Sequence, residues 1–426
     1  MSALNVVEEW KADLKDALGK GVFHLFLSLG FTQGMAFILG MALAIILGPA
    51  NLGHIKVIQV ILQFAAIPAG FGMNSAIVKF VSEFPSEQRK KAVFSQAILL
   101  SLATSLAVAL ILFILAGDDW VIKDSVARHY LRFLCWTVPF AVLATNVLGY
   151  FQGRKQIKKL ATVSVIQQAL MLVVVLGLTR LWLLDGFAAA KFGYTVFSGL
   201  ALAALAGKDF KFIWDRDLFR RIFKFGGLAQ LATSFSITTF TADVICLSAI
   251  LEDPALVGYY GVAIAIARGL MIIPTAITST ALPYLSERRS DPGRIRQMLF
   301  RLGKKLTLVM GCICLLLFFL APRVVGLVFG ERYLPSVKPL RVLMPWLFAA
   351  SLRNLVGSAV IALERPDISF YNSSVGVAVN ITLNIILINS WGMIGAAYAT
   401  LLTDTLKLGT LIFWLWFFVF RKRRRH

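Results

Sequence analysis

Long apolar runs are the feature of this chain that most limits how it can fold. A run of about 18 to 25 apolar residues is long enough to cross the hydrocarbon core of a bilayer as a helix. Twelve such runs are present, at residues 22–47, 57–81, 93–116, 130–150, 160–180, 187–206, 225–250, 257–285, 306–328, 340–363, 369–389 and 392–420. A mean hydropathy of +0.78 also excludes a soluble globule built around one core. The sequence therefore predicts an all-α, multi-pass membrane protein with twelve transmembrane helices.

The positive charges predict the orientation of these helices. The chain holds 43 Lys and Arg and has a net charge of +21. Most of these cations lie in the N-terminus, the even-numbered loops and the C-terminus, which the positive-inside rule places in the cytoplasm. Because they are spread over the loops with no recognition motif beside them, a nucleic-acid partner is not expected. We predict a protein of the cell inner (plasma) membrane with both termini in the cytoplasm.

An internal repeat divides the chain into two halves. At an offset of about 205 residues, PANLG at 49–53 matches PALVG at 254–258, and Pro68 matches Pro274. Each half has six spans, an even number, so both halves enter the membrane with the same orientation. The expected parts are an interfacial helix at 1–20, a first lobe at 21–207, a cytoplasmic linker at 208–224 that forms an amphipathic interfacial helix, a second lobe at 225–420 and a basic cytoplasmic tail at 421–426.

Two features of the repeat have a physical interpretation. In the repeated Pro-x-x-x-Gly, Pro ends one helix and Gly supplies a positive φ, which predicts a short outer turn. The repeated Pro68 and Pro274 fall inside spans two and eight, where the missing N–H can kink a helix. Proline is common in transmembrane helices generally, so an ordinary transmembrane proline is the alternative.

The residue patterns that enzymes and metal sites need are not found in the sequence. The four His are scattered, and the four Cys lie in apolar spans without metal-ligand or redox spacing. No set of Asp, Glu or His lies beside the membrane in a pattern suited to glycosyl transfer. We therefore expect no enzyme, no metal site and no bound cofactor.

Several motifs, taken in order, resemble a known family. They are LGPANLG at 47–53, QGRK at 152–155, FGERY at 329–333, VNITLNIILI at 379–388 and WGMIGAAYAT at 391–400. Their order and spacing are similar to those of the polysaccharide flippases (Wzx type) of the multidrug, oligosaccharidyl-lipid and polysaccharide (MOP) exporter superfamily, over essentially the whole chain. The resemblance implies a V-shaped, two-lobed, MATE-like transporter whose central cavity is lined mainly by spans one, two, seven and eight.

The resemblance also implies a substrate and partners. The substrate would be an undecaprenyl-diphosphate-linked oligosaccharide, moved from the cytoplasmic to the outer leaflet of the inner membrane for O-antigen or exopolysaccharide synthesis. Membrane lipids, a polysaccharide polymerase and glycosyltransferases are the implied partners. A gradient of H⁺ or Na⁺ is the candidate source of energy.

Ionisable side chains inside a bilayer are costly, so they form the candidate site. Six lie within predicted spans, five of them in the second half: Lys79, Asp243, Arg268, Arg353, Asp404 and Lys407. Arg268 matches a position where related lipid-linked peptidoglycan-precursor flippases carry a cavity arginine. Its guanidinium suits a diphosphate because its planar fork donates two parallel N–H bonds. A structural pair with Asp243 is the alternative.

The other candidate ligands for the substrate keep two interpretations each. Lys79 either meets the diphosphate at the cytoplasmic end of span two or extends to the interface. Arg353 either binds ligand or belongs to a polar network inside the second lobe. Gln59, Gln63 and Asn74 on span two either offer hydrogen bonds to sugar or join helices to one another.

Two carboxylates are candidates for ion coupling. Asp243 is the stronger one, because burial and a nearby Arg act on its proton affinity in opposite senses, which suits exchange of H⁺ or Na⁺. Asp404 and Lys407 are three residues apart on span twelve, so they face the same side and neutralise one another. A structural pair is the main interpretation of Asp404, and ion coupling is the alternative.

Three other classes of function compete with the flippase. A MATE-type multidrug or cation antiporter shares the fold, but carboxylates should line its cavity, and here cations outnumber carboxylates within the spans. A peptidoglycan-precursor flippase typically has two further C-terminal spans. A non-transporting membrane scaffold would recruit glycosyltransferases through its basic loops.

Overall fold

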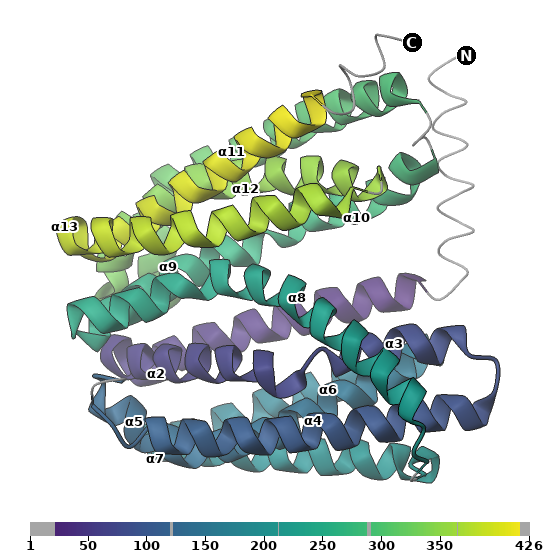
Figure 1. The fold of residues 1–426 in the computed structure, drawn as a ribbon. Helices are drawn as coiled ribbons and strands as arrows, with labels where there is room; N and C mark the ends of the chain where they lie inside the picture. Colours follow the sequence, from purple (N-terminus) through teal and green to yellow (C-terminus); the bar gives the residue numbers. More distant parts are fainter. Residues whose placement is uncertain (1–21, 120–121, 212, 288–290, 364, 418–426) are drawn as a thin grey trace. The chain divides into compact units, whose positions relative to one another are not determined.

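The fold is helical throughout the part of the chain that the structure describes. The structure is a computed structural model that describes residues 22–119, 122–211, 213–287, 291–363 and 365–417, and no strand occurs in these ranges. The α-helices in chain order are α2 (Val22–Gly70), α3 (Met73–Glu83), α4 (Glu87–Leu115), α5 (Ser125–Leu134), α6 (Val138–Gly153), α7 (Ile157–Ala206), α8 (Arg216–Leu251), α9 (Pro254–Leu270), α10 (Ile272–Glu287), α11 (Pro292–Phe329), α12 (Val337–Ala362) and α13 (Pro366–Leu415) (Figure 1). Short 3₁₀ helices are η1 (Cys135–Thr137), η2 (Gly207–Asp209) and η3 (Glu331–Ser336). The interfacial helix predicted at 1–20 and the basic tail at 421–426 lie outside the described residues.

The helices account for the twelve predicted spans. Within the described ranges, eight helical stretches are long and apolar enough to cross a membrane. Three of them lie along α2, α7 and α13, which have 49, 50 and 50 residues, about twice what one crossing needs. Each of the three leaves the helical conformation inside, at Gly48, at Leu183 and at Gly392. Each is therefore two crossings joined by a turn, and α8 carries the seventh predicted span. The prediction of an all-α, twelve-helix, multi-pass membrane protein is confirmed.

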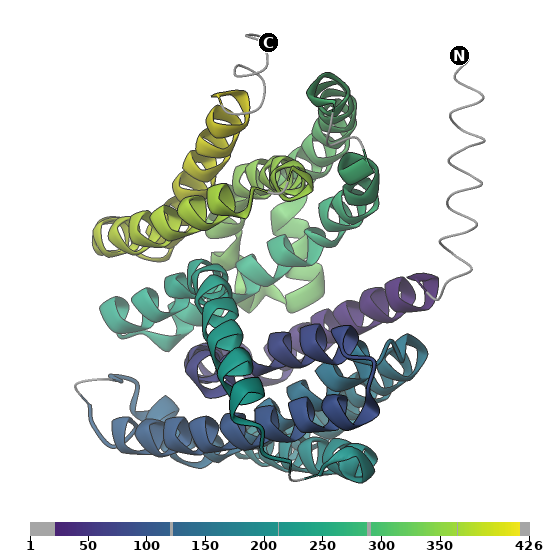
Figure 2. The same cartoon turned by 45° about the vertical axis from the view of Figure 1, so that its right-hand side comes forward.

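The turns of α7 and α13 have the same backbone conformation in the two repeats. Leu183 has φ 50° and ψ −121°, and Gly392 has φ 56° and ψ −137°, close to the first corner of a type II′ turn. Three residues later, Gly186 and Gly395 let the two arms approach, since an added Cβ would lie 1.9 and 2.0 Å from a carbonyl oxygen of the preceding arm. The hairpin of α13 is visible in both ribbon views (Figures 1 and 2). The repeat read from the sequence thus extends to the backbone.

The chain forms two compact units. Unit 1 comprises residues 1–40, 65–114 and 131–230, and unit 2 comprises residues 41–64, 115–130 and 231–426. In unit 1 a core forms between α3, α4 and α6, where the rings of Phe94 and Tyr150 stack 4.3 Å apart. In unit 2 a core includes Ala359, Val360 and Leu411. The lobe boundaries predicted at 21–207 and 225–420 stay a prediction.

The QGRK motif at 152–155 lies in a charge cluster of unit 1. Arg154 contacts Glu87 at 2.8 Å and Asp209 at 2.9 Å, and it donates a hydrogen bond of 3.1 Å to the Tyr150 hydroxyl. Lys91 also contacts Asp209, at 2.9 Å. The cluster joins the end of α6 to the start of α4 and to η2. The QGRK motif, which contributes to the family resemblance, therefore holds helices of unit 1 together.

The linker predicted at 208–224 is only partly an α-helix. Its first residues belong to η2 and to irregular backbone, and α8 begins at Arg216. The Gln96 side chain fixes the irregular part to α4 by donating to the carbonyls of Ile213 and Asp215 at 3.1 and 3.2 Å. The amphipathic helix expected across the whole linker is thus shorter than predicted, because these tertiary hydrogen bonds hold the backbone in another conformation.

Both repeated prolines lie within three residues of a helix break. The break near Pro68 lies on its C-terminal side, so the missing N–H of Pro68, which acts on the preceding turn, does not account for it. In unit 1, α2 ends at Gly70 shortly after Pro68, and Phe71 and Gly72 have positive φ of 45° and 66°. Gly72 lies between α2 and α3, and its N–H donates to Gln230 Oε1 at 2.7 Å. In unit 2, α9 gives way to α10 two residues before Pro274.

We expect Leu183→Gly to stabilise the protein. Leucine is strained at this φ and ψ by about 1 to 3 kcal/mol, which exceeds the entropic cost of about 0.4 to 1 kcal/mol that glycine adds through the unfolded chain. Thermal unfolding in detergent should show a higher midpoint for this variant. The control Leu181→Gly, two residues earlier in regular helix, should lower the midpoint. A lower midpoint for Leu183→Gly as well would contradict the strain.

Candidate functional site

Asp243 on α8 is buried in unit 2, with 1% of its surface exposed. Tyr260 on α9 donates to its Oδ2 at 2.7 Å, and Thr400 on α13 donates to the same oxygen at 2.6 Å. Asn384 on the other arm of α13 donates to Oδ1 at 2.9 Å. These donors are neutral, so they satisfy the carboxylate oxygens without cancelling an ionised charge.

The hairpin of α13 brings together the two polar helix faces that supply this site. On its first arm Asn380 and Asn384 are four residues apart, and on its second arm Thr400, Asp404 and Lys407 recur at intervals of three or four. Residues at these spacings share one face of a helix. Asn384 Nδ2 also donates to the backbone oxygen and to Oδ1 of Asn380, at 3.0 and 3.1 Å. The hairpin thereby holds several hydrogen-bonding groups against α8.

Asp404 is a second buried carboxylate, 3% exposed. Trp346 Nε1 donates to its Oδ2 at 2.7 Å, while Arg353 Nε and Lys407 Nζ lie 3.3 and 3.9 Å from its Oδ1. The predicted contact of Asp404 with Lys407 is present, and Arg353 joins it in a polar network inside unit 2. One negative group thus faces two positive ones.

A small cavity connects the two carboxylates. It is lined by Asp243, Arg268, Trp346, Asn380, Thr400, Thr403 and Asp404. Its volume of about 10 Å³ is room for one water molecule or a small ion, not for a diphosphate. Thr403 lines the cavity and Asn384 donates to Asp243, and the buried Thr403 Oγ1 and Asn384 Oδ1 make no hydrogen bond to the described residues. With Asp243, they offer the oxygen donors that hard cations prefer.

Arg268 lies in the last turn of α9. Its guanidinium interacts electrostatically with Asp243, yet its side chain is exposed in the structure. The role of Arg268 as a ligand for the substrate stays a prediction.

Lys56 on α2 is a second cation in this part of unit 2, and it was not among the predicted site residues. Its aliphatic stem packs on Gly261 of α9, where an added Cβ would lie 3.1 Å from Lys56 Cγ. Lys56 and Arg268 are close enough to repel each other electrostatically. The repeat offset of about 205 pairs Lys56 with Gly261, and that difference between the repeats was a signal that could have identified it.

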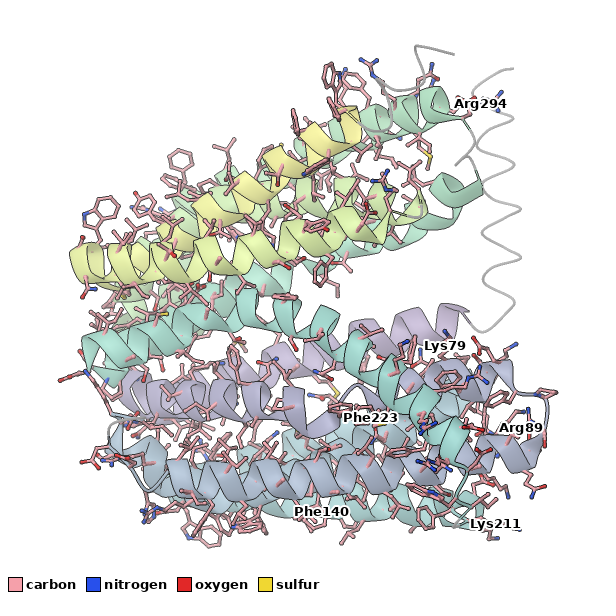
Figure 3. The ribbon with its side chains drawn as sticks, viewed as in Figure 1. Lys79, Arg89, Phe140, Lys211, Phe223 and Arg294 are labelled. Atoms are coloured by element: carbon pink, nitrogen blue, oxygen red, sulfur yellow. The ribbon has the colours of Figure 1, made fainter. Side chains whose placement is uncertain are left out.

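The remaining candidates are distributed over both units. In unit 1, Lys79 is 43% exposed near the end of α3, and its Nζ lies 4.0 Å from Glu83 Oε1 (Figure 3). Also in unit 1, the Asn74 side chain fills the space against Gly149, where an added Cβ would meet its Oδ1 at 2.0 Å. In unit 2, Gln59 is half-buried and Gln63 exposed on α2. The functions predicted for these residues stay predictions.

Three of the four residues that form the Asp243 site were not among the predicted site residues. Asn384 and Thr400 were noted only as part of motifs, and Tyr260 not at all. Neutral polar residues are frequent in membrane helices, so each is uninformative alone. Polar residues recur at intervals of three or four along both arms of α13, and this pattern indicates a polar helix face.

Known proteins share both sequence and fold with this chain. A family described as "Polysaccharide biosynthesis protein" matches residues 18–289. The probable low-salt glycan biosynthesis flippase Agl15 of Haloferax volcanii is 24% identical over 403 residues, which cover 91% of this chain and 81% of that protein. The lipid II flippase MurJ in an inward closed conformation has a TM-score of 0.75 at 16% identity, covering 91% of this chain and 86% of that one. An inward-facing MATE family multidrug transporter of the MOP superfamily has a TM-score of 0.73 at 16% identity, covering 94% and 98%.

We expect Asp404→Ala to destabilise the protein by about 3 to 5 kcal/mol, because it leaves Arg353 and Lys407 buried without their carboxylate partner. Lys407→Met should cost much less, since Arg353 still neutralises Asp404. Unfolding midpoints measured in detergent compare the two variants. Equal losses of stability would contradict the arrangement of one carboxylate between two cations.

Proposed function

This chain belongs to the family of polysaccharide biosynthesis proteins, and we propose on that premise that it is a flippase for a lipid-linked oligosaccharide. The substrate is a glycan joined through a diphosphate to a polyprenol such as undecaprenol. The protein moves it from the cytoplasmic to the outer leaflet of the inner membrane by alternating access between the lobes predicted at 21–207 and 225–420. A polymerase and glycosyltransferases would act on the same lipid-linked glycan.

The names of similar proteins support a transporter rather than an enzyme. Agl15 is named as a probable flippase of glycan biosynthesis, and MurJ as a flippase for lipid II. The likeness to a MATE transporter is one of fold alone, and it leaves the cargo to be argued from the side chains.

Lys56 packs on Gly261 of α9, the helix that carries Arg268 in its last turn, and this placement of two cations is the observation that carries the proposal. Asp243 offsets only one of these two positive charges, and charges within membrane spans are costly unless they are balanced. A diphosphate carries the charge and the oxygens that a guanidinium and an ammonium bind. A drug antiporter for cations would gain nothing from this pair, which favours the glycan flippase over that alternative.

The Asp243 site supports a coupling ion for the same transport cycle. A buried carboxylate with neutral donors, next to a cavity that fits one small ion, suits H⁺ or Na⁺ and excludes larger groups. Arg268 lines this cavity together with Asp243. An ion at Asp243 and a diphosphate at Arg268 therefore act on neighbouring groups.

Arg268→Ala should reduce transport of a polyprenyl-diphosphate glycan by about 10- to 100-fold, because a charge-assisted hydrogen bond is worth about 1.5 to 3 kcal/mol. Transport is measured in proteoliposomes with a fluorescent lipid-linked glycan, whose signal in the outer leaflet is quenched. Lys305→Ala is the matched control, since Lys305 is an exposed cation on α11. Full transport by a well-folded Arg268→Ala protein would overturn the proposed role.

Asp243→Asn should abolish the response of transport to an ion gradient. The amide has no charge to exchange with H⁺ or Na⁺, and its NH₂ group cannot accept the hydrogen bonds that the carboxylate accepts. Transport is compared with and without a Na⁺ gradient, and separately with and without a pH gradient. If the variant retains the sensitivity of the wild type to either gradient, Asp243 is not the coupling group for that ion.

A further inference from the structure

We propose that a polar pocket at the outer end of unit 2 binds one sugar unit of the glycan after the glycan has reached the outer leaflet. The pocket has a volume of about 340 Å³, which is at the small end of the range of about 300 to 1,000 Å³ that ligand pockets occupy. Such a volume suits a sugar ring and excludes a whole polyprenyl-diphosphate glycan. The inference rests on the proposed function, because that function brings a glycan to this side of the membrane.

The pocket is formed by segments on the outer side of the membrane. Lys123 and Ser125 line it from the connection between the third and fourth predicted spans, and Glu252 and Pro254 line it from the connection between the seventh and eighth. The positive-inside rule places both connections outside. All the lining residues belong to unit 2. A glycan that has crossed the membrane therefore meets this pocket on the side where it arrives.

The lining combines apolar and hydroxyl-bearing side chains. Val57 of α2 and Val257 of α9 are buried, 4% and 2% exposed, and form the apolar part. Ser125 at the start of α5 and Ser248 on α8 contribute hydroxyls, each of which can donate one hydrogen bond and accept two. A sugar ring has C–H groups on its faces and hydroxyls around its edge. The lining offers a partner to each of these groups.

His54 contributes an acceptor to the pocket. Its ring nitrogen Nδ1 lies 2.6 Å from Asp124 Oδ2. Burial raises the pKa of the Asp124 carboxyl, but hydrogen bonds from the His54 ring and from the Ala127 N–H outweigh this effect and hold the pKa below its usual value. Asp124 is therefore ionised at neutral pH and accepts the proton of Nδ1–H. In the neutral ring this tautomer leaves Nε2 as an acceptor, which a sugar hydroxyl satisfies.

The carboxylates of the lining suit a hydroxylated ligand better than a metal ion. Glu252 pairs with Lys123 at 2.8 Å, and Asp253 caps α9 by accepting from the Ala255 N–H at 2.8 Å. Each carboxylate thus has a partner of its own. Among the residues that the structure describes, no group of three or more His, Cys, Asp or Glu could hold a metal ion. The carboxylate oxygens keep further lone pairs, which accept hydrogen bonds from sugar hydroxyls.

The first experiment measures sugar binding without transport. Purified protein in detergent is mixed with the water-soluble oligosaccharide that mild acid releases from the cells' own lipid-linked glycan, and saturation transfer from protein to sugar is recorded by NMR. We expect a signal with the wild type and one at least about 10-fold weaker with Ser248→Phe, because the phenyl ring fills the pocket. Ser390→Phe is the matched control, since Ser390 is exposed on α13 and does not line the pocket; it should keep the full signal.

The outcomes separate the pocket from the proposed function. A wild type that gives no signal would overturn the pocket, and so would equal signals from the wild type and Ser248→Phe. A signal from spermidine in place of the sugar, lost in Ser248→Phe, would assign the pocket to a cation and overturn the inference. If the wild type binds the oligosaccharide but moves no lipid-linked glycan in proteoliposomes, the proposed function fails and the sugar site stands.

A second measurement covers the case in which Ser248→Phe fails to fold. Ser248→Cys is made in a protein whose native cysteines are replaced by Ala, at Cys135, Cys246, Cys312 and Cys314. A membrane-impermeant maleimide is added to the outer side of oriented vesicles. The soluble oligosaccharide at ten times its Kd should slow labelling at position 248 by about 10-fold, because the occupied fraction is protected. Labelling of Ser390→Cys should not change. Equal rates at position 248 with and without the oligosaccharide would overturn the sugar site.

Discussion

A carboxylate buried in a membrane has no water to replace a missing partner, and this constraint organises unit 2. Asp243 satisfies this constraint by accepting hydrogen bonds from α9 and from both arms of α13. A single side chain on α8 therefore fixes the relative positions of three other helical segments. Loss of one donor leaves a buried acceptor unsatisfied, so the packing of these helices and the chemistry of the site depend on one another.

The charges of unit 2 separate into two environments that suit different ligands. The cavity between Asp243 and Asp404 is small, which favours a bare ion over a hydrated or larger group. Lys56 and Arg268 interact through repulsion, which favours an anion. Arg268 borders both environments. Under the proposed function, an ion bound at Asp243 weakens the attraction of Asp243 for Arg268 and leaves the guanidinium freer to bind a diphosphate. By thermodynamic linkage the diphosphate then favours the ion equally.

The parts of this structure that could be predicted from sequence are those that depend on local chemistry. Hydropathy is a property of consecutive residues, so the twelve spans follow from it. A charge inside an apolar span is conspicuous, and so Asp243, Arg268 and Asp404 could be selected. The partners of these charges depend on which helix faces meet, and single residues do not reveal that. Tyr260 is an ordinary membrane tyrosine until α9 is packed against α8.

Other differences arise where tertiary contacts override a local pattern. The linker at 208–224 has an amphipathic pattern, yet hydrogen bonds from Gln96 hold its first part in an irregular conformation. Lys56 lies one residue outside the span predicted from hydropathy, so it is not counted as a charge inside a span. Hydropathy does not predict where the end of a long side chain lies. The Lys56 stem lies on Gly261, a contact between the two repeats that only a folded chain shows.

The duplication itself explains which features remain alike in the two halves. An added Cβ on Gly53 would lie 1.8 Å from the Pro254 carbonyl oxygen, and one on Gly258 would lie 2.0 Å from the Pro49 carbonyl oxygen. This reciprocal contact requires glycine on both sides, because a side chain on either one prevents it. Both copies therefore carry glycine at this position. A binding site has no such requirement, since one copy of a charged group is enough. Lys56 and Gly261 occupy equivalent positions and touch each other; the missing side chain in one repeat is what makes room for the cation of the other. The close backbone contact is thus shared between the halves, whereas the charges of the candidate site are divided between them.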